Sequence, residues 1–138
     1  MTGGYAIIKY EYDPYGRLQS ETYLDTEENL VISSEYHCAG MNFAYNDGYG
    51  NRTGREYFGT DGRIMVRDDL GYAGVLLEYN PFGEVVSEEY YGADKKTAKW
   101  KGRGYGYYEQ VYDRGKETER RYFDVKGGNQ PGFRLCQI

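Results

Sequence analysis

His37 and Cys38 are neighbours in the chain, and a histidine beside a thiol could support nucleophilic catalysis. Neighbouring residues of a strand project to opposite faces, so these two side chains would diverge, and no third residue is recognisable that would orient them. One histidine with two distant cysteines, Cys38 and Cys136, is also a poor set of metal ligands. We therefore expect no catalytic residue, no metal and no cofactor, so the protein is not expected to be an enzyme. The two cysteines could form one disulfide or remain unpaired.

Tyrosine is the residue type with the most chemical potential here, since the 138 residues include 18 Tyr, 20 Gly and only 5 Phe. Buried phenol hydroxyls need a partner, so this composition favours a thin structure with rings near its surface. Ring faces can stack on sugars while nearby Asp, Asn and Arg bind hydroxyl groups. The densest candidate platform consists of Trp100, Tyr90, Tyr91, Tyr105, Tyr107 and Tyr108. The alternative is that most of these rings form the core.

The elements that would position these rings are internal repeats. A tyrosine followed by Asp or Asn recurs every 33 or 34 residues, at Tyr12, Tyr45, Tyr79 and Tyr112. The chain therefore reads as a single domain over residues 1–138. Its four repeats span residues 4–36, 37–70, 71–103 and 104–128, and residues 129–138 are expected to cap the C-terminal end.

Each repeat is predicted to be a β-hairpin. Asp13-Pro14-Tyr15-Gly16 and Asn80-Pro81-Phe82-Gly83 have the residue preferences of a type I turn followed by a glycine with positive φ. Apolar residues alternate with charged ones before each turn, which predicts one packed face and one wet face. A short third strand is expected after the second turn of the first two repeats, and no helical period is visible. The fold class is therefore all-β, with tandem β-hairpin repeats forming an elongated antiparallel sheet or β-solenoid. A sheet that closes on itself into a barrel is the alternative.

Charge also follows the repeat. Glu21, Arg55, Glu88 and Arg120 occupy equivalent positions with alternating sign, and they would form a ladder of opposite charges if the copies stack in register. The alternative is chance alternation on a charged surface. The net charge of −5 argues against a nucleic-acid-binding protein, which would show a basic face. No apolar run is long enough to span a membrane, and no signal peptide is visible.

The elements "YEYDPYGRL", "YFGTDGR" and "YFDVKGG" resemble the tyrosine-rich YD repeats of RHS-type bacterial proteins. The resemblance covers about residues 4–128. It implies an extended β-sheet structure within a longer surface or secreted bacterial chain.

Two kinds of function are expected for such a chain. The first is a non-catalytic repeat module that binds a glycan, a cell-wall polymer or a protein through exposed aromatic rings. The alternative is a structural spacer or self-assembling repeat unit without a small ligand. Few residues precede the first strand, so we also expect self-association through an uncovered N-terminal edge that contains Ile7, Ile8 and Tyr10.

Overall fold

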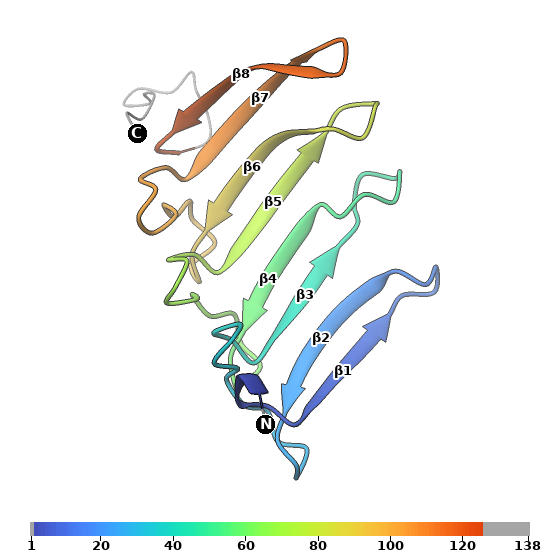
Figure 1. Cartoon of the computed structure of the whole chain (residues 1–138), viewed down its shortest axis with the longest axis vertical. Helices are drawn as coiled ribbons and strands as arrows, with labels where there is room; N and C mark the ends of the chain where they lie inside the picture. The colour runs from blue at the N-terminus through green and yellow to red at the C-terminus, as the bar shows by residue number, and fades with distance from the viewer. Residues whose placement is uncertain (1, 126–138) are drawn as a thin grey trace.

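The computed structural model describes residues 2–125, and all of their strands belong to one antiparallel sheet. The strands follow one another in chain order from β1 at one edge to β8 at the other (Figure 1). The elements are the 3-10 turn η1 (Thr2–Gly4) and the strands β1 (Ile7–Tyr12), β2 (Leu18–Leu24), β3 (Gly40–Ala44), β4 (Gly54–Phe58), β5 (Gly74–Tyr79), β6 (Val85–Tyr91), β7 (Tyr107–Asp113) and β8 (Lys116–Phe123). The predicted all-β elongated sheet of hairpins is confirmed. Within the described residues the sheet is open and not a closed barrel, and the expected cap at 129–138 lies outside them.

The hairpin turns have the predicted chemistry. In the third hairpin, the side-chain carbonyl of Asn80 accepts hydrogen bonds from the backbone N–H groups of Phe82 and Glu84, both at 3.0 Å. The first hairpin has the same arrangement, with an aspartate as the acceptor. Gly16 and Gly83 both have a φ of 80°, a conformation that costs glycine little and other residues more. The prediction of positive φ at these two positions is confirmed.

All four hairpin tips lie at one end of the strands, and the connectors between hairpins lie at the other end (Figure 1). The connectors comprise residues 25–39, 59–73 and 92–106. Each makes one isolated bridge to the strand before it, at Leu24–Leu30, Phe58–Ile64 and Tyr91–Thr97. The expected third strand is therefore reduced to a single bridge. The reason is that the connector must turn again at once to place a side chain in the core and return to the sheet.

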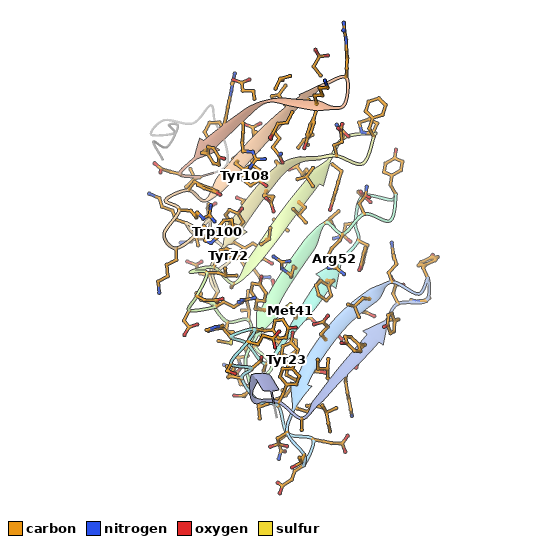
Figure 2. The ribbon with its side chains drawn as sticks, viewed as in Figure 1. Tyr23, Met41, Arg52, Tyr72, Trp100 and Tyr108 are labelled. Atoms are coloured by element: carbon orange, nitrogen blue, oxygen red, sulfur yellow. The ribbon has the colours of Figure 1, made fainter. Side chains whose placement is uncertain are left out.

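The core lies at the connector end and consists mainly of tyrosine rings. Tyr23, Tyr57 and Tyr90 point from the second strands of their hairpins and are fully buried. The connectors add rings on top of them, so that the centroids of Tyr72 and Tyr90 lie 4.7 Å apart. Figure 2 shows Tyr23, Tyr72, Trp100 and Tyr108 along this end of the sheet. One repeating layer of rings therefore replaces the aliphatic core that the composition cannot supply.

The face of the sheet opposite the tyrosine core is solvent-exposed only toward the hairpin tips. Near the connectors it buries one bulky side chain per hairpin, namely Leu24, Phe58, Tyr91 and Phe123. Two of these rings lie against glycines on the neighbouring strand, Phe58 against Gly40 and Tyr91 against Gly74. The face predicted to be solvent-exposed is therefore partly buried at this end, where two cross-strand glycines leave room for rings.

Candidate functional site: the hairpin-tip edge

The six rings predicted as a binding platform are not an exposed surface. Tyr90, Tyr91, Tyr105, Tyr107 and Tyr108 are each at most 8% exposed. Trp100 is partly buried, and its ring meets Tyr72 and Tyr90 edge-on with centroids 6.1 and 5.4 Å away. Trp100 and Tyr105 belong to the last connector and pack on Tyr90, and Tyr105 also contacts Tyr108. Tyr91 and Tyr107 are buried on the opposite face of the sheet, where Tyr107 lies against Phe123. The structure thus places this group in the core, which is the alternative that the sequence left open.

The exposed rings lie instead at the hairpin tips, where the sequence analysis did not place a site. Tyr15, Tyr49 and Phe82 stand on the first three tips and are 83%, 86% and 87% exposed. The signal was present in the turns, since Tyr15 and Phe82 occupy the third turn position between proline and glycine. A side chain at that position lies beyond both strands and therefore cannot pack into the core. The three tips lie along one side of the sheet (Figure 1).

Two guanidinium groups lie against aromatic rings of the first two hairpins, and one of these rings is that of Tyr15. The Arg17 guanidinium lies 5.2 Å from the ring centroid of Tyr15 and 4.7 Å from that of Tyr45, so it links the first two hairpins. Arg52 lies 3.9 Å from the ring of Phe43. These distances are within the range of cation–π attraction. Both guanidinium groups remain partly accessible to solvent.

Tyrosine hydroxyls join neighbouring hairpins just below the tips. Tyr45 donates a hydrogen bond to the backbone carbonyl of Leu18 at 2.8 Å, and Tyr79 donates one to that of Arg52 at 2.6 Å. The equivalent hydroxyl in the fourth repeat, that of Tyr112, accepts a hydrogen bond from the Gln110 side chain at 3.2 Å. Among the described residues it has no bond to the third hairpin, so the last two tips are less tightly joined.

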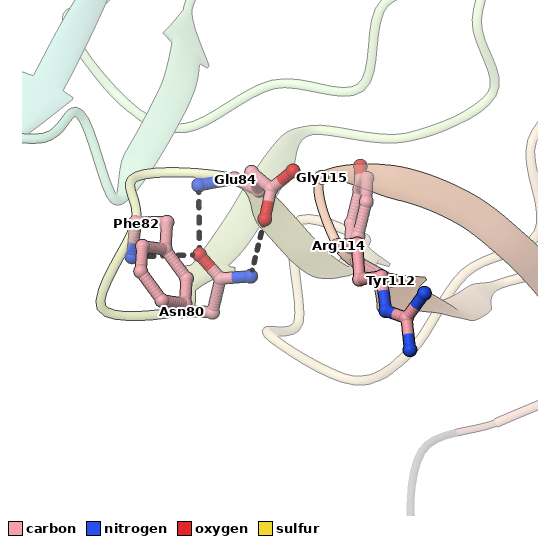
Figure 3. A pocket seen from close by; sticks show the side chains of 6 residues that line it. All are labelled: Asn80, Phe82, Glu84, Tyr112, Arg114 and Gly115. Carbon is pink, nitrogen blue, oxygen red and sulfur yellow. Dashed lines mark hydrogen bonds between the residues drawn. The ribbon is translucent and has the colours of Figure 1, made fainter.

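A hollow of about 510 Å³ lies between the last two tips (Figure 3). Its lining combines one exposed ring with charged and polar groups: Asn80, Phe82, Glu84, Tyr112, Arg114 and Gly115. The amide of Asn80 is engaged in the turn and also donates to Oε1 of Glu84 at 2.8 Å. The Arg114 side chain is almost fully exposed, and its nearest acidic group is that of Asp113 at 4.0 Å. The hollow therefore offers a carboxylate, a guanidinium and an aromatic face to a bound molecule.

His37 and Cys38 lie in a turn of the first connector and not in a strand. The Cys38 thiol is fully buried, and burial raises its pKa to about 11. His37 Nδ1 lies 2.8 Å from Oδ1 of Asp68, so it links the first connector to the second. Asp69 brings a third possible metal ligand within 4.8 Å, but Arg67 already holds its carboxylate with two hydrogen bonds. Cys136, the other member of the possible disulfide, lies outside the described residues.

The predicted self-association edge is β1, the first strand of the open sheet. Ile7 and Ile8 are partly buried, and Tyr10 is half exposed. Ile8 packs against the tyrosine core, whereas Tyr10 projects beyond it.

Residues 2–125 contain no helix long and apolar enough to cross a membrane. Comparisons of the chain with protein-family models, with curated proteins and with solved structures find no match.

Proposed function

We propose that this protein is a non-catalytic repeat module that binds a carbohydrate polymer along the hairpin-tip edge. The observation that supports the proposal is the row of exposed rings at Tyr15, Tyr49 and Phe82, one on each of three successive tips. A large ring this exposed on a tight turn contributes little to the packing of the fold. Rings of this kind are enriched at binding sites because they supply contact area at a low cost in conformational entropy.

The chemistry beside the rings suits a sugar. A pyranose presents an apolar face of C–H groups and a rim of hydroxyls, which match an aromatic face flanked by charged and polar side chains. Arg17 beside Tyr15 and the group of Glu84 and Arg114 beside Phe82 supply such flanks. Successive hairpins are about 10 Å apart, twice the strand spacing, so a regular polymer can meet several tips at once. This repetition would raise the avidity of contacts that are individually weak.

The test is to screen the protein against a glycan array and then to titrate it with any glycan polymer that binds. We expect the variant that combines Tyr15→Ala, Tyr49→Ala and Phe82→Ala to bind at least about tenfold more weakly, equivalent to ~1.4 kcal/mol. Its circular dichroism should not change, because the three rings pack on little. Tyr10→Ala is the matched control, since it removes an exposed ring away from the tips. The proposal would be overturned if no glycan binds, or if the Tyr10→Ala control loses as much affinity as the triple variant. Binding of a protein ligand and of no glycan would instead indicate a protein partner for the hairpin-tip edge.

The resemblance to YD repeats supports placing the module in a longer surface or secreted protein, where it would meet cell-wall or extracellular polymers. We propose self-assembly as a second function, because the sheet is open and both β1 and β8 are edge strands within the described residues. Open edges expose unpaired backbone groups that can pair with another chain.

A further inference from the structure

The described residues contain three joints between repeats, and all three are built alike. Each joint pairs the second strand of one hairpin with the first strand of the next over three residue pairs: β2 with β3, β4 with β5, and β6 with β7. In each, the N–H of a buried tyrosine donates to the backbone carbonyl of the residue that precedes the next hairpin. These bonds run from Tyr23 to Ala39, from Tyr57 to Ala73 and from Tyr90 to Gly106, at 2.8 to 2.9 Å.

The two ends of the array carry the two halves of such a joint. β8 is the second strand of its hairpin and β1 is the first strand of its own, so each presents the edge that an internal joint would cover. The equivalent groups are the N–H of Tyr122 at one end and the carbonyl of Ala6 at the other. No described strand pairs with the outer edge of β8 or of β1.

We propose that copies of this chain associate head to tail, with β8 of one copy pairing antiparallel with β1 of the next in the register of the internal joints. This proposal rests on the second function above and specifies its geometry. The internal pairs Glu21–Met41 and Arg55–Val75 set the register. They place Arg120 opposite Ile8 of the next copy.

The side chains at this joint are complementary. One pair along, the same register places Glu119 opposite Lys9 of the next copy, and opposite charges facing each other across strands are favourable. The Lys9 and Glu119 side chains are about half exposed, and each would exchange its ion-pair partner within the chain, Glu28 for Lys9 and Arg121 for Glu119, for the other across the joint.

The alternating row of charges also continues through the joint. Glu21, Arg55, Glu88 and Arg120 lie on one face, each two strands from the next, and form no direct ion pair with one another in the described structure. Arg55 and Arg120 nevertheless act on Glu88 through space from either side. In a head-to-tail stack, the row resumes after Arg120 with Glu21 of the next copy, so the sign alternation is unbroken.

A third feature is the hydroxyl of Tyr12. The equivalent hydroxyls of Tyr45 and Tyr79 bond to backbone carbonyls of the preceding hairpin, at Leu18 and Arg52. No hairpin precedes Tyr12 among the described residues, and Tyr12 is 60% exposed. In the proposed joint its hydroxyl would donate to the carbonyl of Glu117 of the preceding copy, which is the position equivalent to Leu18.

Such a joint leaves β1 of the first copy and β8 of the last copy open, so the stack has no fixed size. We expect the average mass in sedimentation velocity to rise with concentration beyond twice the 16.0 kDa of the chain. Proline removes the backbone N–H, and it is tolerated on an edge strand where that N–H faces outward. The N–H of Leu77, the counterpart of Tyr10, donates across an internal joint to Thr53 at 2.8 Å. Tyr10→Pro should therefore block the β1 edge, and Arg120→Pro should block β8.

Each proline variant alone should be a monomer, and an equimolar mixture of the two should form a dimer and nothing larger. Tyr10→Thr and Arg120→Thr are the controls, because they shorten the same side chains but keep the N–H. If proline unfolds a hairpin, a charge exchange provides the same test. Lys9→Glu should weaken association, as should Glu119→Lys, and the double variant should recover it.

Two results would overturn the proposal in different ways. A closed dimer that survives Arg120→Pro would show pairing of β1 with β1, so the head-to-tail joint would be wrong while self-assembly would stand. A strict monomer at millimolar concentration would defeat both the joint and the second function. Neither result bears on glycan binding at Tyr15, Tyr49 and Phe82, which is measured separately.

Discussion

The ring of Tyr91 lies directly over Gly74, its cross-strand partner between β6 and β5. A methyl group added to Gly74 would lie 2.2 Å from Cζ and 2.3 Å from Oη of Tyr91. The Tyr91 hydroxyl donates to Oε2 of Glu56 at 2.8 Å, and Lys95 forms an ion pair with the same carboxylate. The ring is thus held over Gly74 by a hydrogen bond at its hydroxyl end. Glycine at position 74 is required for space and not for an unusual backbone angle.

Gly74→Ala should therefore destabilise the protein by about 1–3 kcal/mol, the usual cost of overpacking a filled site. Urea unfolding measures the loss. Gly54→Ala is the matched control, because a methyl group there would lie 3.4 Å from its nearest neighbour, the Cβ of Ala44. The cost of Gly74→Ala should fall when Tyr91 is also replaced by alanine. Additive effects of the two changes would show that the ring does not restrict this glycine.

Gly83 tests the opposite situation, in which the backbone angle matters and space does not. Its φ is 80°, and a methyl group added there would meet nothing within 4 Å. Gly83→Ala should cost about 1–2 kcal/mol through the left-handed conformation alone. Gly83→Asn should cost less, since asparagine tolerates that conformation. Thermal unfolding of both variants checks this, and equal losses would count against a conformational origin.

The hydroxyl of Tyr79 should contribute to the joint between the second and third hairpins. Tyr79→Phe removes its hydrogen bond to the Arg52 carbonyl and should cost about 1 kcal/mol. Tyr112→Phe is the control, because that hydroxyl makes no bond to the preceding hairpin among the described residues. Hydrogen exchange of the backbone amides near the tips should accelerate in the first variant only. A larger effect at Tyr112 would contradict the assignment of this hydroxyl as the link.

Glu88 should make stability depend on pH. Burial raises the pKa of Glu88, and the charges of Arg55 and Arg120 only partly oppose this. Below the ordinary glutamate pKa, both the folded and the unfolded chain carry a proton there. As the pH rises from that value through the higher folded pKa, the unfolded chain ionises first, so the contribution of Glu88 to stability falls.

Glu88→Gln should therefore gain stability relative to the parent between pH 4 and neutrality, with no gain at the acid end. Urea unfolding across this range gives the difference between the two proteins. Glu109→Gln, on the exposed face of β7, controls for the loss of one negative charge. A difference between Glu88→Gln and the parent that does not change with pH would mean that the carboxyl group is not desolvated in the folded state.

The sequence by itself determined the hairpins and their number. The turn residues around Gly16 and Gly83 act through local backbone preferences, and strand alternation is a local period, so both can be read without knowledge of the rest of the chain. The sequence did not reveal that the bulky residues Phe58 and Tyr91 are buried on the face opposite the tyrosine core. Their burial depends on glycines in the paired strands, at Gly40 and Gly74, and that pairing is a property of register.

Only the tertiary structure decided which rings are available to a partner. Tyr90, Tyr105 and Trp100 are close together in the sequence, but the connector that carries Trp100 and Tyr105 packs both rings against Tyr90 in the core. Tyr49 and Phe82 look like ordinary turn residues, but they stand on tips that nothing covers. Tyrosine can serve in a core or on a surface, since it has both an apolar body and a polar end. Burial therefore depends on where each connector runs, and that path is set by contacts between residues far apart in the chain.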